Sequence, residues 1–299
     1  MTLAAEFHCG FAALVGRPNV GKSTLLNALV GAKLSIVTPR PQTTRHRILG
    51  LAQLPDAQIG FLDTPGLHRQ ASRALNKVMN RTAAAALSEA DLVVLVVEAL
   101  TWTHDDALVL QRLARSGRPA IAVVNKADRV RPRERLLPYL AQLAERHRFL
   151  ALVPVSALKA QGIPDLLTTI AKHLPISPPL FDRDTLTDRG LAFRIAETVR
   201  EKLTLELNQE LPYGIAVQVE RLEEVEDRLV VDAVIWVERE GQKPIVIGAG
   251  GQRLKRVGGA ARRALNAQLE RRLHLNLWVK VRENWADNAR ALKDLGLES

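Results

Sequence analysis

The sequence predicts an α/β domain built on a mostly parallel sheet, followed by a smaller α+β domain. Two observations predict this division. Short apolar runs alternate with amphipathic stretches over residues 7–174, which is typical of strands and helices that alternate along a parallel sheet. A proline-rich run at 175–179 then ends the alternation, because proline continues neither a helix nor a central strand. We therefore expect a first domain over 1–175, a linker over 176–189 and a second domain over 190–299.

The first domain contains six apolar runs of strand length, separated by stretches with helical character. Strands are expected at residues 11–15, 48–51, 59–62, 92–97, 120–124 and 150–155. Helices are expected at 24–30, 74–87, 105–115, 133–146 and 164–173. Ligands of such domains bind beyond the carboxyl ends of the strands, so polar motifs that directly follow a strand are candidate site residues.

The second domain has a different order of elements. A helix is expected at 191–207, and two strands with alternating polarity at 215–220 and 229–237. A short segment at 243–247 leads into a glycine-rich turn, a long basic helix is expected at 254–273, and a last strand at 277–281. The predicted order is α-β-β-α-α-β.

Composition limits the class of protein and of partner. The chain has 299 residues, of which 47% are hydrophobic and 25% charged, as in an ordinary soluble protein. The net charge of +10 indicates a polyanionic partner, with general solubility as the alternative. The single cysteine, Cys9, excludes a disulfide framework within the chain and favours a reducing compartment. We expect no signal peptide and no membrane span, hence a cytoplasmic protein.

A phosphate-binding pattern lies between the first predicted strand and the following helix. Residues 16–23 read GRPNVGKS, which matches G-x-x-x-x-G-K-[ST]. The glycines let the backbone curl around a phosphate chain, Lys22 can reach the outer phosphates, and the Ser23 hydroxyl can bind Mg²⁺. The phosphate contacts are expected from Gly16, Asn19, Val20, Gly21, Lys22, Ser23 and Thr24. The alternative, a chance match, is disfavoured by the strand–loop–helix setting.

Two further segments are expected to complete the phosphate and metal site. Asp63 directly follows the strand at 59–62, where it can bind Mg²⁺, and Gly66 can offer its N–H to the γ-phosphate. Between these motifs lie Thr43 and Thr44, and we favour Thr44 as the threonine that completes the Mg²⁺ shell when the γ-phosphate is present. The alternative for the segment from Asp63 to Gly66 is an ordinary turn. The alternative for the segment with Thr43 and Thr44 is a polar loop.

The base is expected to be guanine. Asn125-Lys126-Ala127-Asp128 ends a strand, and a carboxylate at Asp128 can accept two hydrogen bonds from guanine N1–H and N2–H₂, a pair that adenine lacks. Lys126 can lie along the base plane. Ser156-Ala157-Leu158 ends the next strand and can supply a backbone N–H to guanine O6. All four motifs in this order predict a domain that binds GTP or GDP with Mg²⁺.

The source of catalytic assistance is unusual. Leu67 follows the Asp63–Gly66 motif where many GTPases carry a glutamine that positions water, and leucine cannot orient water. Catalysis must then depend on phosphate and metal electrostatics or on an external group. One hypothesis is that the Asn19 amide oxygen binds K⁺ beside the β–γ bridge; the alternative is that Asn19 only shapes the loop.

The second domain carries a candidate RNA-binding motif. Residues 248–251 (Gly248, Ala249, Gly250 and Gly251) form a G-x-x-G turn, which lets a phosphodiester backbone approach closely while bases lie along an apolar groove. The turn lies in a segment, 241–282, with ten Lys or Arg residues and one acid, a net charge of +9. Phosphate contacts are expected from Arg253, Lys255, Arg256, Arg262 and Arg263. The alternative for the G-x-x-G turn is a glycine pair that only connects two helices. The alternative for the basic residues is a solvated helix face.

Taken together, these segments resemble the Era family of bacterial ribosome-assembly GTPases. The resemblance is carried by residues 16–27, 41–47, 63–66, 125–128, the G-x-x-G turn and 283–287. It implies a type II KH fold, hydrolysis of GTP to GDP, and binding to the 3′ end of 16S ribosomal RNA during maturation of the 30S subunit. It also implies some peripheral association with the inner membrane, and we expect a monomer. Ala249 and Gly250 depart from the family pattern, since KH turns usually carry a polar or basic residue there.

These observations lead to three hypotheses of function. We favour a GTPase switch in which GTP orders the loop around Thr43 and Thr44 and this state favours RNA binding. The second is an RNA-binding module in which the nucleotide is only structural, and Leu67 supports it. The third is a membrane-associated signalling GTPase whose basic surface contacts anionic lipid.

Overall fold

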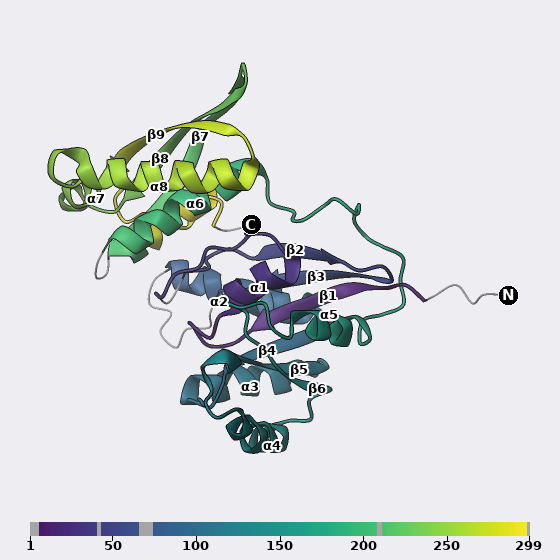
Figure 1. Cartoon of the computed structure of the whole chain (residues 1–299). Helices are drawn as coiled ribbons and strands as arrows, with labels where there is room; N and C mark the ends of the chain where they lie inside the picture. Colours follow the sequence, from purple (N-terminus) through teal and green to yellow (C-terminus); the bar gives the residue numbers. More distant parts are fainter. Residues whose placement is uncertain (1–5, 41–42, 66–73, 208–210, 298–299) are drawn as a thin grey trace. The chain divides into compact units, whose positions relative to one another are not determined.

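The computed structural model describes residues 6–40, 43–65, 74–207 and 211–297 (Figure 1). The chain forms two compact units. Most of residues 6–188 belong to the first unit; residues 189–297 form the second, together with 36–40, 43 and 74–78. The domain boundaries expected from the sequence stay a prediction.

The first unit contains a six-stranded sheet in the order β2-β3-β1-β4-β5-β6. Its strands are β1 (His8–Val15), β2 (Ile48–Gln53), β3 (Ala57–Asp63), β4 (Leu92–Glu98), β5 (Ala120–Asn125) and β6 (Ala151–Pro154). All neighbouring strands pair in parallel except β2, which pairs antiparallel with β3. The predicted, mostly parallel α/β sheet is confirmed.

Helices cover both faces of this sheet. Leu87, Leu113 and Leu143 come from α2, α3 and α4, and they pack in one core cluster with inward residues of the central strands. The helices α1 and α5 instead contact β1, β3 and each other. The helices of the unit are α1 (Lys22–Val30), α2 (Ala74–Glu89), α3 (His104–Ser116), α4 (Leu136–Arg146) and α5 (Ile163–Ala171).

The parallel register brings the candidate motifs to one edge of the sheet. β1, β3, β4 and β5 end at Val15, Asp63, Glu98 and Asn125, respectively. The pairing places Leu14 opposite Asp63 and Glu98 opposite Asn125, so β1 ends beside β3 and β4 beside β5, while β4 runs three residues past the position opposite Val15. The residues that follow them therefore share one edge, as expected for an α/β sheet.

The second unit contains a three-stranded sheet in the order β7-β8-β9, with β7–β8 antiparallel and β8–β9 parallel. In Figure 1, α6 and α8 lie side by side over one face of this sheet, and Val199, Val257 and Ile235 meet in the core between the two layers. Its elements are α6 (Leu191–Glu206), β7 (Ile215–Val225), β8 (Arg228–Val237), α7 (Lys243–Ile247), α8 (Gln252–Leu269), β9 (Arg272–Val281) and α9 (Ala289–Asp294). The predicted order α-β-β-α-α-β is confirmed through β9.

The end of the long basic helix was predicted wrongly. The helix stops at Leu269 rather than at residue 273, because Glu270 adopts a left-handed conformation with φ 52°. Leu273 instead belongs to β9 and is buried in the core, and its N–H donates to the Asn266 side chain at 3.0 Å. The apolar period alone could not separate the helix from the strand that follows it.

The segment after β9 is anchored by Trp285. Its indole is fully buried, and its Nε1–H donates to the Gly214 carbonyl at 3.2 Å. This buried hydrogen bond ties the 283–287 segment to the start of β7. In the part of the chain that the structure describes, no helix combines the length and apolarity needed to cross a membrane.

Candidate functional site

The phosphate-binding pattern forms a tight loop between β1 and α1. Lys22 begins α1, and its ammonium donates to the carbonyls of Gly16 and Arg17 at 2.9 and 3.0 Å. The first N–H groups of α1 have no acceptor within the helix and point toward the loop, as they do at the N-terminus of any helix. This arrangement can bind phosphate. Thr24 lies in the same first turn.

One glycine in this loop is required by its neighbour. Gly21 has φ 100°, and a Cβ built there would lie 2.4 Å from the Asn125 amide nitrogen. That amide donates to the Val20 carbonyl at 2.8 Å, while the Asn125 Oδ1 accepts from the Ala157 N–H at 3.0 Å. Asn125 therefore joins the phosphate loop, the end of β5 and the loop after β6 through one buried side chain.

Oxygen atoms gather where the metal was expected. The Ser23 hydroxyl lies 2.8 Å from the Thr44 hydroxyl and donates to Asp63 Oδ2 at 3.0 Å. Ser35, which sequence reasoning missed, also donates to Asp63 Oδ2 at 3.0 Å. The other carboxylate oxygen, Asp63 Oδ1, is buried without a partner among the described residues. The hydroxyls of Ser23 and Thr44, with a carboxylate that has an unused buried oxygen, fit the hard-oxygen preference of Mg²⁺.

Burial perturbs both charged groups of this site. Desolvation is the main cause that lowers the pKa of Lys22 to about 8; the Asp63 carboxylate opposes this shift and Arg17 adds to it. Desolvation likewise raises the pKa of Asp63, and Lys22 and the hydroxyls of Ser35, Ser23 and Thr44 oppose the rise. Both groups would regain favourable partners from a bound phosphate and cation.

The two candidate threonines lie in different surroundings. Thr44 is buried beside Ser23 and Asp63. The Thr43 hydroxyl instead donates to the Arg40 carbonyl and lies near the Thr38 hydroxyl, both at 2.8 Å. Gly66 and Leu67 lie outside the described residues.

The candidate guanine site lies after β5 and β6. The Ser156 hydroxyl bonds the Asp128 carboxylate, and this hydrogen bond is the main cause that lowers the pKa of Asp128 below its usual value. Lys159 adds a cation 3.9 Å from Asp128 Oδ2. Asp128 is therefore held ionised as a pure acceptor, which suits a pair of N–H donors. The Lys126 ammonium donates to the Asn19 carbonyl at 2.9 Å, next to the exposed Asn19 side chain.

In the second unit, the G-x-x-G turn connects α7 to α8. Gly248 (φ 76°) has no room for a side chain, since a Cβ would lie 2.7 Å from the Arg253 Cβ. Gly250 and Gly251 also have positive φ but face open space, and Ala249 is exposed. The turn thus presents bare backbone to a ligand.

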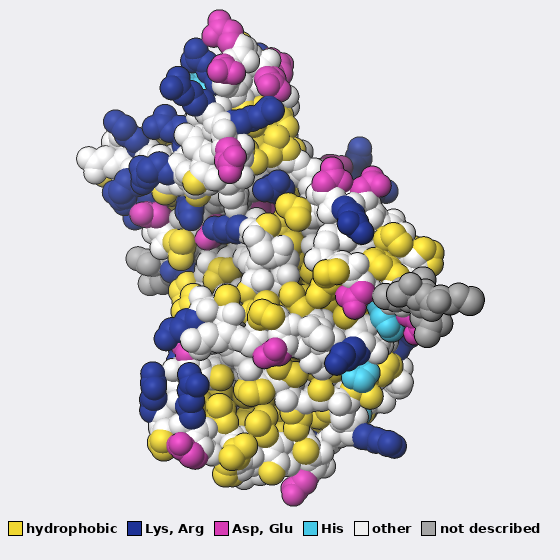
Figure 2. Space-filling view, turned by 45° about the vertical axis from the view of Figure 1, so that its right-hand side comes forward, with side chains coloured by type: hydrophobic (Ala, Val, Ile, Leu, Met, Phe, Trp, Pro, Cys, Tyr) yellow, Lys and Arg dark blue, Asp and Glu magenta, His cyan; other side chains and the backbone are white. Residues whose placement is uncertain are grey.

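A groove of about 720 Å³ runs between α8 and β9. Four of the predicted RNA-binding residues line it, and Figure 2 shows Lys and Arg side chains gathered on this unit. Trp278 lines the same groove with 45% of its surface exposed. The groove therefore combines cations, an apolar floor and an exposed aromatic ring. Its lining consists of Gly251, Leu254, Lys255, Gly258, Gly259, Arg262, Arg263, Leu275, Asn276, Leu277 and Trp278.

Two of the arginines that were expected to contact RNA phosphates instead contact other parts of the protein. The half-buried Arg253 donates to the Ile245 carbonyl and so closes the turn between the two helices. Arg256 pairs with Glu206 of α6 at 3.2 Å. Neither lines the groove.

Sequence reasoning missed Trp278 as well as Ser35. An aromatic residue at an outward position of the last predicted strand is a signal that could have found Trp278. Ser35 follows no strand and belongs to no motif, so only the fold brings it to Asp63.

Comparison with known proteins agrees with both sites. A family model for a 50S ribosome-binding GTPase matches residues 11–126, and a model for the KH domain matches residues 210–286. GTPase Era of Stenotrophomonas maltophilia (strain K279a) is 50% identical over 298 residues, covering 100% of both chains. GTPase Era of Xanthomonas axonopodis pv. citri (strain 306) is 50% identical over 296 residues, 99% of each chain.

Solved structures extend the comparison. A variant of Aquifex aeolicus Era bound to GDP and AlF₄⁻ matches with a TM-score of 0.94 and 39% identity, covering 98% of this chain and 100% of that one. An Era structure in complex with MgGDPNP and nucleotides 1506–1542 of 16S ribosomal RNA matches with the same values. The predicted fold, a GTPase domain followed by a KH domain, is thereby confirmed. With relatives this similar along its whole length, the chain belongs to the Era family of GTPases, enzymes that hydrolyse GTP.

Proposed function

We propose that this GTPase binds the 3′ region of 16S ribosomal RNA through its KH domain and acts as a nucleotide-controlled switch in 30S subunit maturation. The groove between α8 and β9 carries this proposal. It presents Lys255, Arg262 and Arg263 beside the exposed Trp278, so it offers both phosphate contacts and a stacking surface for an unpaired base. The similarity to an Era that holds 16S RNA nucleotides supports the same partner.

Within the GTPase domain we assign roles from the contacts described above. Lys22 and the backbone of the phosphate loop bind the β- and γ-phosphates. Ser23, Thr44 and Asp63 would hold Mg²⁺, which would supply positive charge to those phosphates. Gly66 is proposed to donate its N–H to the γ-phosphate.

The guanine base is assigned to the loops after β5 and β6. Asp128 reads N1–H and N2–H₂, and Lys126 lies along the ring. The Ala157 N–H is bound to Asn125, so guanine O6 is assigned to this N–H or to that of the adjacent, exposed Leu158. Asp128→Asn should weaken GTP binding and favour xanthosine triphosphate, and unchanged GTP affinity would remove this assignment.

The switch is proposed from the position of Thr44. Because Thr44 already lies beside Ser23 and Asp63, a bound Mg²⁺ would hold this threonine and thereby order the neighbouring segment. RNA affinity measured with a non-hydrolysable GTP analogue, with GDP and without nucleotide tests the proposal. We expect the tightest binding with the GTP analogue; equal affinity in all three states would reject the switch.

Phosphate release measured with and without a 16S 3′-end RNA tests the enzymatic side. We expect slow release by the protein alone and faster release with RNA. The Asn19 side chain is exposed in the phosphate loop, and we propose it as a ligand of K⁺, which would bring positive charge to the β–γ bridge. Release at equal rates in KCl and NaCl would reject the K⁺ site.

A further inference from the structure

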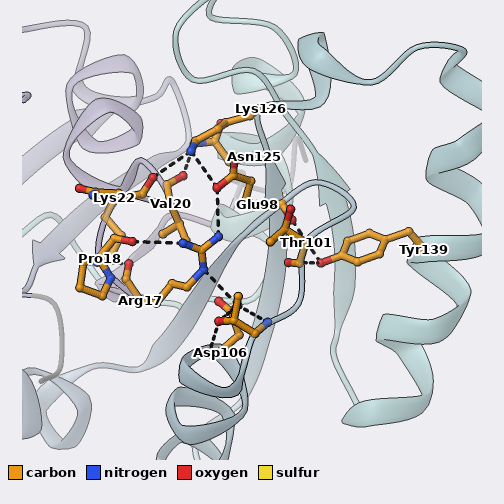
Figure 3. Close-up of polar contacts among 12 residues, drawn as sticks. Arg17, Pro18, Val20, Lys22, Glu98, Thr101, Asp106, Asn125, Lys126 and Tyr139 are labelled. Carbon is orange, nitrogen blue, oxygen red and sulfur yellow. Dashed lines mark hydrogen bonds and ion pairs between the residues drawn. The ribbon is translucent and has the colours of Figure 1, made fainter. Parts of the chain in front are cut away.

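A cluster of four charged side chains lies directly behind the phosphate loop (Figure 3). Arg17 is part of the loop, Glu98 ends β4, Asp106 lies in the first turn of α3, and Lys126 follows β5. The parallel pairing of β4 with β5 sets Glu98 opposite Asn125, and Lys126 is therefore within reach of Glu98. We call these four residues the Glu98 network.

Glu98 holds two cations with one oxygen. Its Oε2 lies 3.0 Å from Arg17 Nη2 and 2.9 Å from Lys126 Nζ. Lys126 Nζ also donates to the Asn19 carbonyl at 2.9 Å. The phosphate loop and the guanine motif are therefore joined twice, once through the chain Arg17–Glu98–Lys126 and once by the direct contact of Lys126 with Asn19.

The other side of Arg17 is bound as well. Its Nε donates to Asp106 Oδ2 at 3.1 Å, and that oxygen also accepts from the N–H and the hydroxyl of Thr103 at 2.8 and 2.7 Å. The Arg17 side chain is only 16% exposed, and that of Asp106 only 1%. With a carboxylate on two of its edges, Arg17 is neutralised and fixed behind the loop, so its charge is not directed at the phosphates.

The network is shielded from water on one side. The Tyr139 hydroxyl bonds the carbonyls of Glu98 and Thr101 at 3.2 and 3.1 Å, and burial raises the pKa of Tyr139 to about 12. Burial also acts to raise the pKa of Glu98, but the bonds and charges of Lys126 and Arg17 outweigh it and lower the pKa below the usual value. Glu98 is therefore a charged, partly desolvated acceptor, the situation in which removing one partner has the largest effect.

We infer that Glu98 is a positioning residue for nucleotide binding: it fixes Lys126 against the base plane and Arg17 behind the phosphate loop, and so couples the guanine and phosphate subsites. This inference rests on the proposed role of Lys126 in guanine binding. Pre-organisation of both subsites by one carboxylate reduces the ordering that a nucleotide must impose, so it slows nucleotide release.

The test is the rate of release of fluorescent GDP from the full-length protein. Glu98→Gln keeps the shape but removes the charge and puts an amide N–H₂ in reach of the two cations. We expect release to accelerate about tenfold, the scale for loss of a hydrogen-bonded charge. Glu98→Asp keeps the charge on a shorter side chain, and an intermediate rate is expected. Glu145→Gln, on the exposed face of α4, is the matched control and should release GDP at the wild-type rate.

A double-mutant cycle separates positioning from a general loss of stability. If Glu98 acts through Lys126, then Glu98→Gln combined with Lys126→Ala accelerates release by clearly less than the product of the two single effects. Multiplying effects, or an unchanged rate in Glu98→Gln while Lys126→Ala accelerates release, would overturn this inference alone. An unchanged rate in Lys126→Ala would reject the guanine role of Lys126 and this inference with it. The melting temperature of each nucleotide-free variant shows whether the fold is intact.

Discussion

The buried Lys22 should make nucleotide affinity depend on pH in a range where ordinary lysines do not titrate. Its pKa of about 8 in the nucleotide-free protein means that about 90% of the molecules carry the charge at pH 7 and about 25% at pH 8.5. A bound phosphate chain favours the charged form, so binding above pH 8 must first add a proton to Lys22. The affinity for GDP should therefore fall about fourfold between pH 7 and about 8.5.

Titration calorimetry in two buffers of different ionisation enthalpy measures both quantities. Little proton uptake is expected at pH 7 and about three-quarters of a proton per GDP at pH 8.5. Lys22→Arg is the control, because arginine stays charged throughout; it should bind GDP more weakly, with only the pH dependence that titration of GDP causes. Titration of the nucleotide itself is common to both proteins. A flat wild-type profile, or the same slope in Lys22→Arg, would refute the reasoning.

Three further predictions follow from the geometry of the two sites. Gly21→Ala should weaken nucleotide affinity at least about tenfold, because it strains a backbone at φ 100° and displaces the Asn125 amide; Gly31→Ala, strained at φ 72° but facing open space, should spare affinity in the same fluorescence titration. Trp278→Ala should weaken RNA binding by about 1–3 kcal/mol in an anisotropy assay while leaving RNA-independent GTP hydrolysis unchanged. Arg262→Gln should reduce the slope of log affinity against log salt by about 0.7, and an unchanged slope would remove Arg262 from the phosphate contacts.

The sequence was sufficient to place the motifs because each follows a strand. A strand that is buried on both faces has a continuous apolar sequence, and β4 and β5 are almost entirely buried. Parallel pairing then brings their ends together without further information. For this reason Lys22, Ser23 and Asp63 could be assigned to one site from their positions in the chain, and the structure places them together.

Residues that belong to no motif could not be predicted in the same way. Ser35 reaches Asp63 only because Asn27 bonds the N–H and C=O groups of Ser35 and so fixes that part of the loop. The roles of Arg253 and Arg256 were equally inaccessible, since a basic helix does not reveal which of its cations already have a partner. Pairing of side chains across elements depends on tertiary distances, which composition and period do not contain.

In the second domain, the absence of a cationic side chain from the G-x-x-G turn changes where the protein places positive charge along the groove. The exposed turn residues Ala249 and Gly250 have no cationic side chain, so the turn itself can bind a phosphate only through backbone N–H groups. The cations that line the groove all lie on α8, about one to three helical turns after the G-x-x-G motif: Lys255, Arg262 and Arg263. The cationic side chains that line the groove therefore come from the helix, whereas Ala249 and Gly250 of the glycine turn contribute none, and Trp278 lines the same groove. A single strand of RNA drawn to this domain would therefore be held most firmly where its bases can also stack, which joins affinity and base contact in one part of the groove.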